Sequence, residues 1–266
     1  MDIAAIIEST ILIVPVVLAF SNWFLSLFLA RKTTNYFAVD LKQLWPDSLP
    51  FLKAQWPIVT IAMIAVSWSQ LRPALESSNR PEFSLAVTVL DYGPIVITWI
   101  LMLFYVSYLS EPKYPGRVAT IGAGSLLVYV ISDTMIVTVG ALGLFFLLAP
   151  CLIVFVRSCL FLPIYAAHGH QPLSAIKRSW ALTKDKYWLV SRYMGLPPLI
   201  LISISISPVI VDNFWGLSGQ AALQNCAPLI VATGAINLLL SLVIGGLLYK
   251  LYERLSAAEN NRLNEQ

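Results

Sequence analysis

Charged side chains are scarce in this chain: Asp, Glu, Lys and Arg make up 12% of its 266 residues, and hydrophobic residues make up 58%. Soluble domains carry about twice as many charged residues. This small number of charged residues cannot cover the surface of an ordinary water-soluble domain, and the composition therefore excludes the class of water-soluble globular proteins. The net charge of +3 is small, and no basic arm or RNA-binding signature is present, which argues against nucleic acid as a partner. The composition predicts a polytopic membrane protein.

Cysteine and histidine are also sparse. The chain has three cysteines and two histidines, and the cysteines stand in apolar contexts without CxxC spacing, so neither a disulfide framework nor a zinc site is expected. His168 and His170 would need ligands from another segment to bind a metal ion. No nucleophile with a neighbouring base and no nucleotide-binding loop can be recognised. We therefore expect no enzymatic activity, no metal and no cofactor.

The N-terminal region lacks the pattern of a secretory signal. Asp2 and Glu8 stand where a basic region should be, and the apolar run continues to Ala30. Residues 1–30 are expected to remain as an additional transmembrane helix.

Long apolar runs, by contrast, are abundant. A span needs about 20 apolar residues, and the chain offers six or seven such runs. They are Ile6–Leu29, Pro57–Leu71, Tyr92–Leu109, Val118–Leu148, Cys151–Ala167, Leu189–Val211 and Leu229–Tyr249. Together they predict an all-α transmembrane bundle.

One apolar region, from Val118 to Ala167, is too long for a single helix across a bilayer. It must turn, either at the polar Ser132-Asp133-Thr134 or at Pro150, which removes a backbone donor. Both sites give the same number of crossings. We favour Pro150, which also matches the family pattern described below.

Basic residues predict which side each loop occupies. They alternate with acidic or neutral loops, as the positive-inside rule requires of cytoplasmic segments. This places the N-terminus outside and the C-terminus in the cytoplasm of a bacterial inner membrane, with one membrane domain over residues 31–255 and a polar tail over 256–266. The basic segments hold Arg31, Lys32, Lys42 and Lys53; Lys113 and Arg117; Lys177 to Lys186; and Lys250 and Arg254.

Two amphipathic segments are expected to lie on the cytoplasmic membrane surface. In residues 172–188 an apolar stripe at steps of three and four lies beside several cations. Residues 36–56 are similar, but Pro46 and Pro50 should break any long helix there. Lys and Trp recur in both segments just before a span, which leaves an internal repeat open. The apolar stripe in residues 172–188 consists of Leu173, Ile176, Trp180, Thr183 and Tyr187.

A stretch of about forty residues resembles YciC-like bacterial inner-membrane proteins and the membrane domain of some glycerophosphoryl diester phosphodiesterases. In that pattern a Pro-Gly turn precedes a span with an arginine and a later proline, and an Ala-x-x-Arg-Ser-x-x-Leu-Thr surface helix follows. Cys151 replaces the turn glycine, and His168 to His170 replace a loop that is often acidic. The resemblance implies an α-helical inner-membrane fold and supplies no reaction. The matching positions are Pro150, Arg157, Pro163, Ala175, Arg178, Ser179, Leu182 and Thr183.

A polar layer inside the membrane is the first candidate site. Arg157 would lie about 10 Å inside the outer boundary, counting 1.5 Å per residue from Pro150, and intramembrane charge is a functional hypothesis by default. Asn237 and Ser207 fall in roughly the same layer, and Asp133 lies deeper as a candidate proton or cation relay. Each has a structural alternative, namely helix packing or snorkelling. Asn237, Ser241 and Gly245 also form a small polar stripe suited to helix packing.

The second candidate site is the basic surface helix itself. Each Lys or Arg near an anionic leaflet is worth about 1 kcal/mol, so this helix is expected to contact anionic lipid headgroups. The residues concerned are Lys177, Arg178, Lys184, Lys186 and Trp180.

Three functions remain open on the sequence. The first is a non-enzymatic protein that handles lipids or small molecules in the envelope. The second is a scaffold or accessory subunit that binds another membrane protein or a second copy of itself. The third, with less support, is a secondary transporter that uses Asp133 and the Pro197-Pro198 break.

Overall fold

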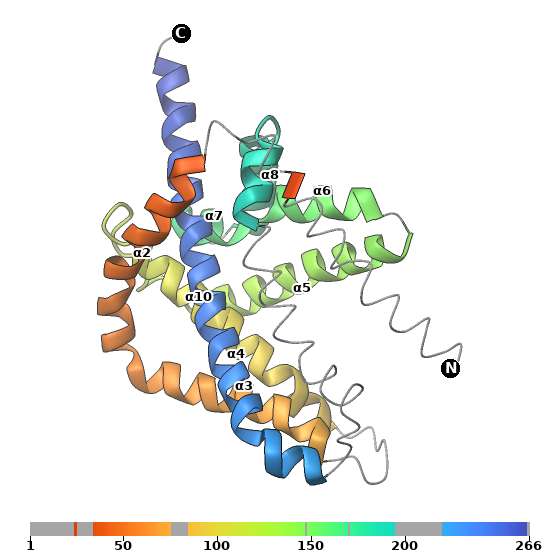
Figure 1. The fold of residues 1–266 in the computed structure, drawn as a ribbon. Coiled ribbons are helices and arrows are strands. Elements are labelled where there is room, and N and C mark those ends of the chain that lie inside the picture. Colours follow the sequence, from red (N-terminus) through yellow and green to blue (C-terminus); the bar gives the residue numbers. More distant parts are fainter. Residues whose placement is uncertain are drawn as a thin grey trace.

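The computed structural model describes residues 24–25, 34–75, 85–146, 148–169, 171–194 and 220–264. Throughout these residues the regular secondary structure is helical (Figure 1), which confirms the all-α class. The predicted span Ile6–Leu29 lies outside the described residues apart from Phe24 and Leu25, and Leu189–Val211 is described only to residue 194.

Three long helices form the central bundle: α3 (Trp56–Leu75), α4 (Leu85–Ser110) and α10 (Gln220–Asn264). Helix α10 packs on both α3 and α4 (Figure 1). Gly234 lets two backbones approach, because a Cβ at this position would lie 2.7 Å from the Ser67 Cα. At 1.5 Å per residue the 45 residues of α10 extend over about 67 Å. The segment predicted as a polar tail is therefore helical as far as Asn264.

The long apolar region turns beside Pro150. Helix α5 (Ala123–Phe146) continues through Asp133 without interruption, and α6 (Leu148–Ser158) begins two residues later and packs against it. Pro150 thus lies in the first turn of α6, where its missing N–H has no helical acceptor to lose. The preference for Pro150 over Asp133 is confirmed.

The predicted span Cys151–Ala167 is wrong as a single helix. It is divided between α6 and the short, fully buried helix α7 (Phe161–Ala167), with a turn at residues 159–160. Pro163 explains this turn, because its ring lacks the N–H that would bond the carbonyl of Cys159 and clashes with that carbonyl. Neither helix alone has the length of a span.

Helix α2 (Thr34–Ala54) is continuous, so the expectation that Pro46 and Pro50 would break it is wrong. Both prolines lie on its exposed side. The opposite side is buried at Asp40, Leu44, Ser48 and Phe51, at helical spacing, and these contacts hold the helix together. The axis bends by 92° between α2 and α3.

Helix α8 (Pro172–Thr183) is shorter than the predicted surface helix, because the chain turns at residues 184–185 and resumes as helix over 187–194. Pro172 begins α8 at a position that favours proline. Helix α8 packs on α6, α7 and α10.

The number of crossings remains a prediction. Among the described residues one helical segment, Gly234–Asn261, is long and apolar enough to cross a membrane. The bent pair Val39–Ala54 and Trp56–Ser67 qualifies only when its two parts are taken together. Shorter apolar helices are Val96–Ser110, Ala123–Ile136 and Ile153–Ala167. Six to seven spans are therefore not confirmed.

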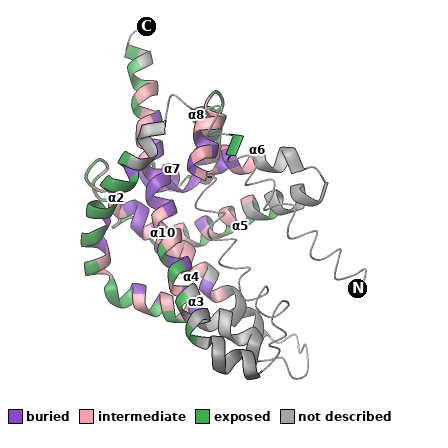
Figure 2. Cartoon of the chain, viewed as in Figure 1, coloured by how far each residue is buried: buried purple, intermediate pink, exposed green. Residues whose placement is uncertain are grey.

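Burial is concentrated where α4, α7 and the middle of α10 meet (Figure 2). Six tyrosines are among the largest fully buried side chains, and their aromatic rings pack inside the core. Several of the predicted basic residues, namely Lys113, Arg178, Lys250 and Arg254, form ion pairs that involve the C-terminal half of α10. The largest buried tyrosines are Tyr105, Tyr129, Tyr165, Tyr193, Tyr249 and Tyr252.

Candidate functional site

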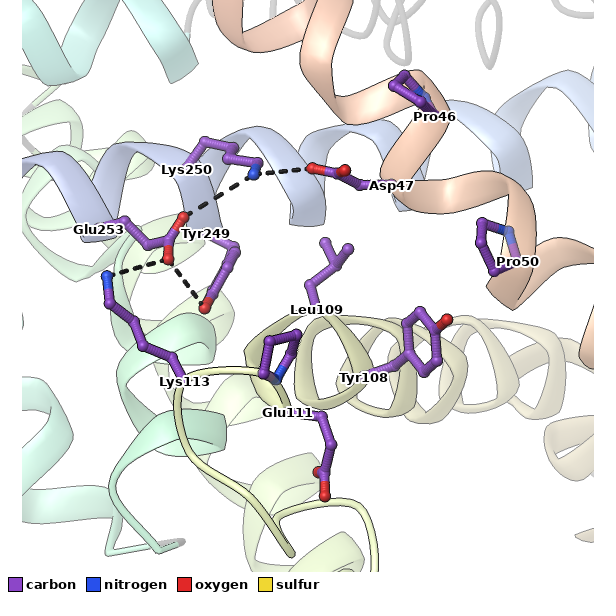
Figure 3. A pocket seen from close by; sticks show the side chains of 11 residues that line it. Pro46, Asp47, Pro50, Tyr108, Leu109, Glu111, Lys113, Tyr249, Lys250 and Glu253 are labelled. Atoms are coloured by element: carbon purple, nitrogen blue, oxygen red, sulfur yellow. Dashed lines mark hydrogen bonds and ion pairs between the residues drawn. The ribbon is translucent and has the colours of Figure 1, made fainter.

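A pocket of about 730 Å³ lies between α2, the end of α4 with the loop after it, and α10 (Figure 3). Prolines and tyrosines form its apolar part, and two lysines and three carboxylates form its polar part. Such a mixture of apolar walls and a few charged groups is typical of ligand sites. The lining residues are Pro46, Asp47, Pro50, Tyr108, Leu109, Glu111, Pro112, Lys113, Tyr249, Lys250 and Glu253.

Close packing between α2 and α10 fixes one wall of this pocket. A Cβ at Gly246 would collide with Leu44 and lie 2.9 Å from the Tyr105 Oη, so a larger residue there would require these two side chains to shift. Ser48 donates to the Leu44 carbonyl over 2.6 Å and forms a 2.5 Å hydrogen bond with Tyr105. Because the Ser48 proton is used on Leu44, Tyr105 is the donor to Ser48. These contacts hold α2 against α4 and α10.

The charges in the pocket form a connected chain (Figure 3). Lys250 pairs with Asp47 of α2 at 2.9 Å and with Glu253 at 3.9 Å. Glu253 also accepts from Lys113 and from the Tyr249 hydroxyl, both at 3.2 Å. Solvent reaches the charged side chains of these pairs, whereas Tyr249 is buried, and solvent-exposed ion pairs are worth at most about 1 kcal/mol. A charged ligand can therefore exchange with them at little cost.

Glu111 organises the loop that borders the pocket. Its two carboxylate oxygens accept hydrogen bonds from the backbone N–H groups of Gly116, at 2.5 Å, and Val118, at 3.1 Å. The bonds from Val118 and then Gly116 hold the pKa of this carboxyl below its ordinary value. Gly116 has a φ of +82°, which a residue with a side chain rarely adopts. This glycine and Glu111 together shape the loop that carries Lys113 and Arg117.

A buried carboxylate next to the pocket was missed by the sequence analysis. The side chain of Asp40 is 1% exposed and accepts from the Arg254 Nε at 2.9 and 3.0 Å, from its Nη2, and from the Tyr193 hydroxyl at 2.5 Å. These residues join α2, the helix at 187–194 and α10. One signal was available, since Asp40 lies on the same helical stripe as Leu44, Ser48 and Phe51.

The predicted intramembrane layer is not assembled around Arg157. Arg157 ends α6, and its guanidinium lies 5.4 Å from the centre of the Trp180 ring of α8, a cation–π contact. The Ser179 hydroxyl donates to the Arg157 carbonyl at 2.5 Å, and the Trp180 indole donates to Ser158 at 3.2 Å. These partners belong to the surface helix. Arg157 therefore joins α6 to α8.

The other members of that layer lie elsewhere. Asp133 is in the middle of α5, and Asn237 is buried on α10, whose main neighbours are α3 and α4. Gly245 contacts α4, since a Cβ there would lie 3.3 Å from Val106. The stripe of Asn237, Ser241 and Gly245 is thus used for packing within the chain and offers no free face to a partner. Ser207 lies outside the described residues.

The predicted lipid-contact residues, which lie on α8 and in the turn after it, fall into two groups. Lys177 and Lys184 are exposed, as expected for headgroup contact. Arg178 instead pairs with Glu259 of α10 at 2.8 Å, and Trp180 is held by Ser158 and Arg157 while remaining 37% exposed. Lys186 is half-buried. Leu173, on the predicted apolar stripe, is 73% exposed.

The residues of the family-like pattern form the packed side of α8. Ala175, Ser179, Leu182 and Thr183 are all buried. Small and hydroxyl-bearing side chains let α8 lie close to α6 and α7. The pattern therefore describes how the surface helix is attached, while its cations and Leu173 remain outside.

Comparisons with models of protein families, with curated proteins and with solved structures find no match to this chain. Among the described residues no group of three or more His, Cys, Asp or Glu could hold a metal ion.

Proposed function

We propose that this chain is a multi-pass protein of the bacterial inner membrane, of the YciC-like type, that binds phospholipids at its cytoplasmic face and acts on them without catalysing a reaction. The observation that carries the proposal is the charged pocket of about 730 Å³ beside apolar helix surfaces. Its lysines suit a lipid phosphate, and its carboxylates suit an amine or hydroxyl of the headgroup.

Exposed apolar side chains support the membrane setting. On α3, Ile61 and Ile64 are each 64% exposed, and on α5 Leu127 and Met135 are 61% and 64% exposed. Such side chains form stripes along the helices, at the spacing of one face, and water would disfavour them. Lipid chains would cover them, as the predicted bundle requires.

Helix α2 has a second apolar stripe suited to the membrane surface. Leu41, Trp45 and Leu49 are exposed beside the buried stripe of Asp40, Leu44 and Ser48, and Trp56 continues the exposed row at the start of α3 (Figure 2). A helix with one side on the bundle and a tryptophan-bearing side outside fits the interfacial region of a bilayer. The pocket then lies at headgroup depth, because α2 forms one of its walls.

The gathering of basic segments supports the cytoplasmic orientation. Lys113 and Lys250 share the acidic partner Glu253, and Lys250 and Arg254 of α10 pair with Asp47 and Asp40 of α2, so basic residues from segments far apart in the sequence lie beside the same part of α10. The positive-inside rule assigns such a gathering of basic residues to the cytoplasm.

Native mass spectrometry after extraction in a mild detergent tests the proposal. We expect phospholipid to be retained by the wild type and its occupancy to fall in the double variant Lys113→Ala/Lys250→Ala. The matched control is Lys42→Ala/Lys53→Ala, which removes the same charge from exposed positions on α2 that do not line the pocket. Absence of retained lipid from the wild type, or equal losses in both double variants, would contradict binding in the pocket.

A further inference from the structure

A second group of cationic side chains lies near the pocket and lines no part of it. Arg117 comes from the loop between α4 and α5, His168 from the loop between α7 and α8, and Arg178 from α8. The Arg117 Nη1 lies 3.1 Å from where a Cβ on Gly169 would stand, so the guanidinium covers the backbone beside His168. Gly169 has a φ of +87°, which favours glycine. Three segments thus converge on one location.

The electrostatics of His168 confirm this proximity. Burial lowers the pKa of His168, and the positive charges of Arg178 and then Arg117 lower it further. The His168 Nε2 lies 2.6 Å from the Tyr252 hydroxyl, and its ring packs against Tyr114 with centroids 5.7 Å apart. These contacts hold the ring against Tyr114 and α10, within electrostatic reach of both arginines.

The acidic groups nearby do not satisfy the two guanidinium groups. Glu259 accepts from the Arg178 Nη2 at 2.8 Å, while the buried Arg178 Nε has no hydrogen-bond partner among the described residues. Glu111 lies near Arg117 but directs its oxygens to the Gly116 and Val118 N–H groups.

Arg117 is the less satisfied of the two arginines. Within the part of the chain that the structure describes, its guanidinium forms no hydrogen bond or ion pair, and its Nε is buried. A buried, unpaired donor on a charged group is costly to the folded protein, so an acceptor is expected there.

We propose that Arg117, Arg178 and His168 form a binding site for a phosphate group, supplied either by a membrane phospholipid or by free phosphate. The planar guanidinium fork matches the oxygens of phosphate in a bidentate manner, and two such forks give a charge and a geometry that a single lysine does not. His168 adds a third donor when it is protonated. The site is independent of the phospholipid pocket and of its ligand.

The test uses the full chain in a non-ionic detergent and two probes, short-chain phosphatidylglycerol and inorganic phosphate. Binding is followed by native mass spectrometry. Arg117→Ala and Arg178→Ala should each weaken binding by about tenfold or more, because each loses a charge-assisted pair. Arg117→Lys, which keeps the charge and loses the fork, should also bind less tightly than the wild type. Lys53→Ala, which removes one charge from an exposed position on α2, should leave binding unchanged.

The two probes identify the source of the phosphate. Saturable binding of phosphatidylglycerol alone assigns the site to a lipid, saturable binding of inorganic phosphate assigns it to a soluble ligand, and binding of both assigns recognition to the phosphate group itself. The proposal is overturned if neither probe saturates or if Lys53→Ala weakens binding as much as Arg117→Ala. Should Arg117→Ala not fold, Arg117→Lys decides the question. Lipid retention in the pocket, tested by the Lys113 and Lys250 variants, can fail while this site binds.

Discussion

Replacement of Arg254 by methionine is expected to destabilise the protein more than replacement of Asp40 by asparagine, although the two residues form one ion pair. The reason is the difference in exposure, since the Asp40 side chain is 1% exposed and that of Arg254 is 36% exposed. Methionine keeps most of the arginine stem and its packing. In the Arg254→Met variant the Asp40 carboxylate stays buried, with the Tyr193 hydroxyl among its remaining hydrogen-bond donors.

The magnitudes follow from the environment of each partner. Removal of one partner from a buried pair costs about 3–5 kcal/mol, because an uncompensated charge stays inside the protein. In the Asp40→Asn variant the new side chain is uncharged and can still accept from Tyr193, while Arg254 regains contact with water. We therefore expect about 1–3 kcal/mol for this variant, the range for lost hydrogen bonds to a charged group.

Reversible unfolding in mixed micelles, followed by circular dichroism, measures both values. The double variant should cost less than the sum of the two single variants, because the second change removes a charge that the first has left unpaired. An Asp40→Asn variant as unstable as Arg254→Met, or strictly additive effects, would refute a buried carboxylate held by Arg254.

Two further predictions concern helix packing and pH. Gly246→Ala should destabilise the protein clearly, because its Cβ would collide with Leu44 and lie 2.9 Å from Tyr105. The control is Gly245→Ala, whose Cβ would lie 3.3 Å from Val106. It should have a much smaller effect in the same unfolding assay. The second prediction concerns pH, and the free energy of unfolding should fall below about pH 6.5. The groups around His168 are Arg178, Arg117, Tyr114 and Tyr252, and the pKa of His168 is lowered in the folded protein. Below that pH the folded protein therefore binds fewer protons than the unfolded chain, which favours unfolding. His168→Gln should flatten this part of the profile; an unchanged slope would exclude His168 as its source.

The sequence predicted the helices of the bundle better than their interruptions. Apolar runs locate α3, α4, α5 and α10 because burial in protein or lipid requires them. Proline had opposite effects at two places, since Pro163 accompanies a break and Pro46 does not. The difference lies in tertiary contacts, because the buried stripe of α2 compensates for the lost backbone bond, and such contacts cannot be derived from local propensity.

Candidate sites were predicted unevenly for a related reason. Exposure of Lys177 and Lys184 follows from the amphipathic pattern of one helix. The pairing of Asp40 with Arg254 joins residues 214 positions apart, and nothing in the local sequence of either specifies the other. Arg157 was placed by counting from Pro150 along one helix, and such a count could not show that the turn at residues 159–160 brings α8 over the end of α6, where Trp180 contacts the guanidinium.

The basic residues have a second role besides orientation. Lys250, Lys113, Arg254 and Arg178 each pair with an acid from another segment, so they help to assemble the end of the molecule that they mark. On α8 this pairing uses Arg178 and leaves three of the four predicted cations for the leaflet. At about 1 kcal/mol for each cation, the attraction of α8 to an anionic surface falls from about 4 to about 3 kcal/mol. Leu173 and Trp180, which are exposed on the same helix, then contribute to membrane attachment through burial of their apolar surface.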